Sequence, residues 1–127
     1  MEKTENALNW FEIAVSDISR AKKFYDIVFD ISTAQVEMMG MSMAVFPADD
    51  SAGKVSGALV QSEMHKPSSE GAVIYLNGNP DLEVPLGRVA EAGGQVAMAK
   101  TFVNEQVGYM AFFIDTEGNK VGLHSHK

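Results

Sequence analysis

The order of predicted secondary structure occurs twice in this chain, and that repetition restricts the fold more than any other feature. Apolar spacings predict a strand, a helix and three strands in the first half, at residues 7–15, 18–29, 31–37, 41–47 and 55–62. A polar linker follows at 63–71, and the same order then restarts at residues 72–77, 82–92, 95–101, 109–115 and 120–125. We therefore predict an α+β fold of two tandem βαβββ modules within one domain spanning 1–127, with module one at about 7–62 and module two at about 72–126.

The first strand has two chemically different faces. Side chains alternate across a strand, so Phe11 and Ile13 share one face while Trp10 and Glu12 share the other. The aliphatic and aromatic face is suited to a core. The face that combines an indole with a carboxylate is suited to a ligand cavity.

The helix after this strand is marked by a cap and an apolar stripe. Asp17 is a favourable N-cap, because its carboxylate can accept hydrogen bonds from the free amides of the first turn. Apolar residues recur at three- and four-residue spacing, which predicts one buried face, at Ile18, Ala21, Phe24, Tyr25 and Val28.

Charge and composition exclude several classes of partner and site. The net charge of −7 argues against nucleic acid, since phosphate binding requires a basic surface. The chain has no cysteine, which excludes disulfides, thiolate nucleophiles and cysteine-based zinc sites. We find no leader-like start and no apolar run of membrane-spanning length. We expect a cytoplasmic protein without nucleic-acid or membrane partners.

Three segments carry a resemblance to a known family, at residues 11–25 (FEIAVSDISRAKKFY), 88–94 (RVAEAGG) and 112–123 (FFIDTEGNKVGL). Through them the chain resembles the vicinal oxygen chelate superfamily, which includes glyoxalase I, bleomycin-resistance proteins and extradiol dioxygenases. The resemblance implies that two βαβββ modules form a curled mixed-sheet half-barrel around a shared cavity. In metal-dependent members, four side chains from the first and last strands of each module hold a divalent cation there.

The residues at those four positions do not suit a metal. Aligned by the motifs, the positions fall on Trp10, Ala58, Val73 and Gly122. None of these side chains offers a metal ligand. We expect no metal at the usual position and no other cofactor, and a divalent metal would need a rearranged site.

Two polar residues lie one pleat beyond these positions. Glu12 and His124 share strand faces with Trp10 and Gly122, so we predict that both point into the cavity. As a catalytic pair, Glu12 would act as a base or as the acceptor for His124, and His124 as a donor. The alternative is a buried Glu–His hydrogen bond without chemistry. With Tyr75 as a third group, the pair could hold an ion weakly.

Eight residues make up the predicted ligand-binding cavity: Trp10, Glu12, Met43, Ala58, Val73, Tyr75, Gly122 and His124. Met43 belongs to a group of four methionines within 38–43 that would line a ligand site, form a subunit interface or pack in the core. Trp10 would stack on a planar ligand or fill the space of a metal. His65 and His126 are expected to be exposed and without a role.

The resemblance leaves several functions open. One is a protein that binds a small molecule in the sheet-lined cavity without the usual metal. Another is a glyoxalase-like lyase, isomerase or dioxygenase with a rearranged divalent-metal or acid/base site on Glu12 and His124. The third is an interaction module whose own side chains fill the cavity. The resemblance also implies a homodimer.

Overall fold

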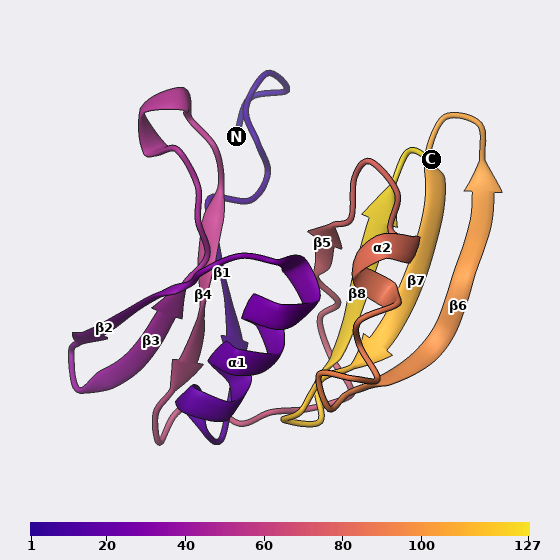
Figure 1. Cartoon of the computed structure of the whole chain (residues 1–127). Helices are drawn as coiled ribbons and strands as arrows, with labels where there is room; N and C mark the ends of the chain where they lie inside the picture. Colours follow the sequence, from indigo (N-terminus) through magenta and orange to yellow (C-terminus); the bar gives the residue numbers. More distant parts are fainter.

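Two four-stranded sheets flank one long helix (Figure 1). The computed structural model describes residues 1–127, except for the side chain of Asp50. The first sheet contains β1 (Trp10–Ala14), β2 (Ala34–Met38), β3 (Met41–Val45) and β4 (Ser56–Gln61). The second contains β5 (Tyr75–Asn77), β6 (Gln95–Asn104), β7 (Gly108–Ile114) and β8 (Lys120–Ser125). The helices are α1 (Ile18–Phe29), α2 (Glu83–Leu86) and a short 3₁₀ turn, η1 (Asp50–Ala52).

The two sheets have the same topology. Their strand orders are β1-β4-β3-β2 and β5-β8-β7-β6, so each module places its first strand beside its last. These inner pairs are parallel and the remaining pairs are antiparallel. In register, Glu12 lies opposite Ala58 and Tyr75 lies opposite Gly122. The predicted α+β fold of two βαβββ modules is confirmed.

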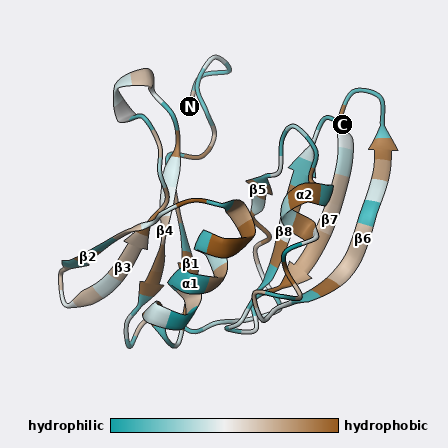
Figure 2. Cartoon of the chain, viewed as in Figure 1, coloured by the Kyte–Doolittle hydropathy of each residue, from teal (hydrophilic) through white to brown (hydrophobic). Residues whose placement is uncertain are grey.

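The helix α1 forms where the sequence predicts it. Asp17 caps its start by accepting a 3.1 Å hydrogen bond from the backbone N–H of Arg20, and Asp30 ends it in a left-handed conformation. The apolar stripe is buried as predicted. In Figure 2, hydrophobic and hydrophilic residues alternate along α1, as expected for a helix with one buried face.

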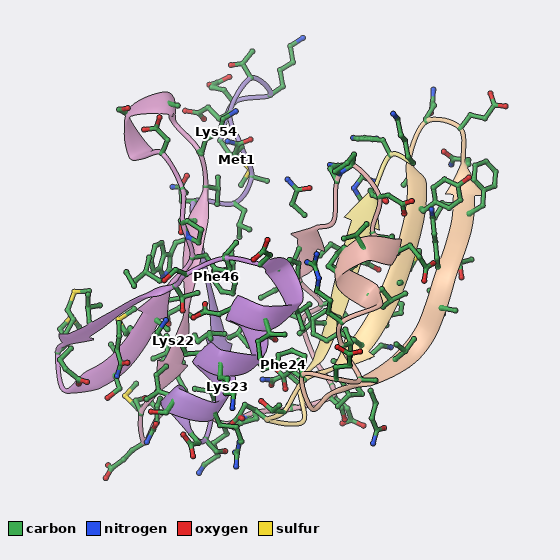
Figure 3. The ribbon with its side chains drawn as sticks, in the orientation of Figure 1. Met1, Lys22, Lys23, Phe24, Phe46 and Lys54 are labelled. Atoms are coloured by element: carbon green, nitrogen blue, oxygen red, sulfur yellow. The ribbon has the colours of Figure 1, made fainter. Side chains whose placement is uncertain are left out.

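One core joins the two modules across α1. The ring of Phe24 lies 5.8 Å from that of Phe113 on β7, and Tyr25 donates a 2.7 Å hydrogen bond to Asp115. Figure 3 shows Phe24 on the side of α1 that faces the second module. Ile13 and Leu59 of the first sheet belong to the same buried cluster. The buried face of α1 therefore holds the two modules together. The opposite face of each sheet does not take part in this core.

The second module departs from the prediction in three places. The helix predicted at 82–92 is only four residues long, and hydrogen-bonded turns continue from it to Gly94. Gly87 caps α2 and disfavours extension of the helix. The strand predicted at 72–77 begins at Tyr75, while β6 extends to Asn104 through several register shifts.

In the described part of the chain, no helix is long and apolar enough to span a membrane.

Candidate functional site

The alternation in β1 produces a second face that points away from α1. Ile13 is buried in the main core, whereas the Trp10 side chain on the opposite face is 42% exposed. The same opposite face carries a small separate cluster of Met43, Ala58 and Val60. This face of the first sheet thus combines a buried apolar cluster with an exposed indole and one carboxylate, Glu12.

Glu12 is fixed by hydrogen bonds to both carboxylate oxygens. Trp10 Nε1 donates to Oε2 at 3.2 Å, and His65 Nε2 lies 2.8 Å from Oε1. The His65 hydrogen bond is the largest influence and holds the pKa of Glu12 below 4.5, although desolvation acts to raise it. Glu12 is therefore ionised at neutral pH, and its side chain remains 34% exposed.

His65 is itself oriented by a serine. Its Nδ1 lies 2.7 Å from Ser62 Oγ, which also accepts a 3.0 Å hydrogen bond from the backbone N–H of Met64. Because an ionised Glu12 can only accept, His65 donates the Nε2 hydrogen to it, and the Ser62 hydroxyl is the partner of Nδ1. Ser62, His65 and Glu12 form one continuous hydrogen-bonded chain.

The prediction that His65 is solvent-exposed was wrong. Its side chain is only 20% exposed, because a turn from Ser62 to His65 folds the linker back over β1. The Ser-x-x-His spacing at the end of β4 is a sequence signal for this turn, since serine hydroxyls bond to nearby backbone amides.

The predicted approach of Glu12 to His124 does not occur. His124 Nε2 is bonded to the carbonyl oxygen of Val107, and its ring lies edge-on to His126 at 4.9 Å. The reason is topological: His124 lies near the end of β8 in the second sheet, opposite Asn77 and Met110. No described hydrogen bond or ion pair links the two predicted catalytic residues.

The predicted cavity residues line separate hollows. Glu12 borders a small pocket of about 160 Å³ between the modules, together with Lys66 and Lys120. His124 and Tyr75 line another, of about 450 Å³, on the second sheet. A third pocket of about 420 Å³ is mainly apolar and lies between the modules, lined on one side by Phe11 and Phe46 and on the other by Tyr75.

The four positions that bind metal in metal-dependent relatives do not fit a metal here. Val73 lies before β5, so Tyr75 rather than Val73 is the neighbour of Gly122. A Cβ atom on Gly122 would lie 2.5 Å from the Tyr75 ring, which leaves no room for a ligand side chain. Trp10 and Ala58 offer no donor atom to a cation. Among the described residues, no three His, Asp or Glu side chains come together as a cation site.

One comparison with known proteins identifies a family. The family model for the Glyoxalase/Bleomycin resistance protein/Dioxygenase superfamily matches residues 7–123. A comparison with curated proteins found no match.

Solved structures share the fold at low sequence identity. Hypothetical protein SA1046 from S. aureus is 22% identical, with a TM-score of 0.63 and 95% of each chain covered. A glyoxalase/bleomycin resistance protein from Albidiferax ferrireducens T118 is 17% identical, with a TM-score of 0.68. The match covers 96% of this chain and 100% of that chain. A glyoxalase I mutant from Zea mays is 19% identical, with a TM-score of 0.71. The match covers 92% of this chain and 46% of the longer Zea mays chain.

Proposed function

The chain belongs to the glyoxalase/bleomycin resistance protein/dioxygenase superfamily, and from this premise we propose that it binds a small molecule on one face of the first sheet. The proposed binding face surrounds Trp10 and Glu12. Binding there does not use the metal of the metal-dependent relatives. The observation that carries the proposal is the fixed, ionised carboxylate beside an exposed indole. A large apolar ring left open to solvent beside an oriented charge is typical of a binding site.

The chemistry of this face indicates the class of ligand. Each Glu12 oxygen accepts one hydrogen bond within the protein, and a carboxylate oxygen can accept two. Glu12 can therefore still accept a hydrogen bond from a ligand N–H or O–H group. The Trp10 face favours a planar or cationic group. We propose a small aromatic ligand with a cationic or N–H donor group.

A second candidate function is proton transfer by the chain of Ser62, His65 and Glu12. A base in hydrogen-bond contact with an acid, and oriented by a third group, is the arrangement used in general acid–base catalysis. The supporting observation is that His65 takes the place foreseen for His124. In this candidate the protein is a glyoxalase-like lyase or isomerase that moves a proton on its substrate. We propose no oxygen-activating or metal-dependent step, because the residues present do not fit the metal.

We also propose a homodimer located in the cytoplasm. Large hydrophobic side chains are exposed on the strands of both sheets, among them Val36, Tyr75, Val96 and Phe102. A second copy of the chain could cover such faces, as the resemblance implies.

The experiment uses the single tryptophan, Trp10, as its own reporter. A panel of small aromatic cations, with neutral aromatic isosteres as comparison, is titrated against the purified protein while indole fluorescence is followed. We expect saturable quenching by cations, lost in Glu12→Gln and retained in the exposed-surface control Glu91→Gln. Equal responses of Glu12→Gln and the parent protein would contradict the proposal. Stoichiometric divalent metal that disappears in Glu12→Gln would overturn its metal-free part.

A further inference from the structure

Half of the chain's methionines are gathered in one hairpin. Of eight methionines, four are Met38, Met39, Met41 and Met43. The strand β2 ends at Met38, β3 begins at Met41, and Met39 with Gly40 forms the two-residue connection. Figure 3 shows sulfur atoms around this hairpin.

The strand register brings three of these side chains to the same face. Met38 lies directly opposite Met41, and Met43 lies on the same face opposite Val36. Met43 is 2% exposed and packs with Ala58 and Val60, so packing accounts for it. Met38, by contrast, is 49% exposed. Met41 is partly buried and packs against the Met43 cluster, so burial leaves Met38 and Met39 unexplained.

The turn makes a methionine at position 39 unexpected. Met39 has φ 54° and Gly40 has φ 74°, so both residues are left-handed, as in the type I′ turns of short hairpins. Such turns favour Asn, Asp or Gly, because other side chains are strained there. Met39 is nevertheless 85% exposed, so neither packing nor backbone preference explains it. An unfavourable residue at an exposed tip indicates a function for its side chain.

The chemistry of the hairpin tip points to a soft metal ion. Thioether sulfur prefers Cu(I) over hard divalent cations, and the chain has no cysteine to compete for it. The nearest carboxylate along the strand, Glu37, lies on the opposite face and accepts hydrogen bonds from Ser42 at 2.9 and 3.0 Å. The side chains that β2 and β3 place on the methionine face at the hairpin tip are therefore thioethers rather than carboxylates.

We propose that Met38, Met39 and Met41 form a binding site for Cu(I), in which three thioethers surround the ion. Opposed residues at the end of a hairpin have Cα atoms about 5.5 Å apart, and methionine has three rotatable side-chain bonds. The sulfurs of Met38 and Met41 can therefore meet at one ion, while Met39 closes the site from the turn. The site does not involve Trp10 or Glu12, so it is independent of the proposed ligand face.

Silver(I), the air-stable analogue of Cu(I), is the first probe. Protein carrying ¹³C-methyl methionine is titrated with silver nitrate in chloride-free buffer, and the methyl resonances are followed by NMR. We expect one equivalent to shift the signals of Met38, Met39 and Met41. Met64, which is 91% exposed but isolated, should not respond below that equivalence. Competition with bicinchoninate then measures Cu(I) affinity directly.

Leucine substitutions separate metal binding from apolar contact. Met→Leu keeps the size and hydrophobicity but removes the sulfur, so Met38→Leu/Met39→Leu/Met41→Leu should keep the fold and lose binding. Each single change should weaken Cu(I) binding by about tenfold or more, while Met64→Leu should leave it unchanged. Equal binding by the triple variant, or equal shifts of Met64 and the hairpin methionines, would overturn the proposal.

Discussion

Glu117 and Arg20 join the two modules at the start of α1, with Arg20 Nε 2.7 Å from Oε2 and Arg20 Nη2 2.9 Å from Oε1 of the carboxylate. Oε1 also accepts hydrogen bonds from the backbone N–H groups of Ser16 and Asp17, both at 2.9 Å. A carboxylate from the second module thus supplies partners for amides that precede α1 of the first. The Glu117 side chain is fully buried, whereas the Arg20 side chain is half exposed.

This contact predicts a loss of stability in acid. Burial raises the pKa of Glu117, but the hydrogen bonds from Arg20, Thr116 and the backbone outweigh it and lower the pKa to about 2. Because the folded-state pKa is below the usual 4.5, the stabilisation is fully present above pH 4.5 and is lost as pH falls toward 2.

The variant Glu117→Gln should cost about 1–3 kcal/mol in the free energy of unfolding at neutral pH. Its stability should also fall less steeply than that of the parent protein between pH 4.5 and 2. Urea unfolding across this pH range measures both effects. Glu91→Gln serves as the surface control, and identical acid slopes for Glu117→Gln and the parent would contradict the assignment.

The hydrogen bond from Tyr25 to Asp115 predicts a second pH effect, in alkali. Burial, followed by the nearby Asp115 charge, raises the pKa of Tyr25 well above its usual 10.0. The unfolded chain ionises this phenol near pH 10 while the folded chain keeps it protonated, so stability is lost as pH rises above 10. Tyr25→Phe should lose about 1 kcal/mol at neutral pH and show a shallower alkaline decline. The matched control is Tyr109→Phe, a partly exposed tyrosine outside this pair, which should keep the parental slope.

The pKa of the Glu12 carboxyl group should depend on its hydrogen bond to His65. His65 is the main reason that the pKa of Glu12 lies below its usual value, so His65→Asn should raise that pKa toward 4.5. Removing the hydroxyl with Ser62→Ala leaves the Glu12 contact in place and should change the pKa much less. Carboxyl ¹³C titrations by NMR give both values. An unchanged Glu12 pKa in His65→Asn would show that the pair is not formed in solution.

Local sequence patterns were sufficient for the parts of the fold that depend on near neighbours. The cap at Asp17 and the stripe ending at Val28 define α1, because capping and helical spacing are properties of a few consecutive residues. The placement of Glu12 and Ile13 on opposite faces of β1 was likewise predicted from the alternation of side chains along a strand. The repeated order of elements then predicted both sheets.

The site depended on contacts that local patterns do not encode. Whether His65 or His124 meets Glu12 is decided by how the linker turns back over β1 and by which sheet contains β8. Neither arrangement leaves a periodic signal in the sequence. Similarly, the family motifs aligned Val73 with a metal position, but the short β5 places Tyr75 beside Gly122.

The contact between Gly122 and Tyr75 gives a final prediction. It tests why residue 122, which aligns with the family's last metal-binding position, is a glycine. The ring of Tyr75 occupies the space that a Cβ atom at position 122 would need. Gly122→Ala should therefore cost about 1–3 kcal/mol of stability through overpacking. In a Tyr75→Val background the ring is gone, so the same change should cost much less. Urea unfolding of the two single variants and the double variant measures the coupling, which we expect to be about 1–2 kcal/mol for residues in direct contact. Pairing Gly122→Ala with Val36→Ala, in the other sheet, should instead give additive losses. If Gly122→Ala and Tyr75→Val also added simply, another obstruction at position 122 would have to explain the glycine.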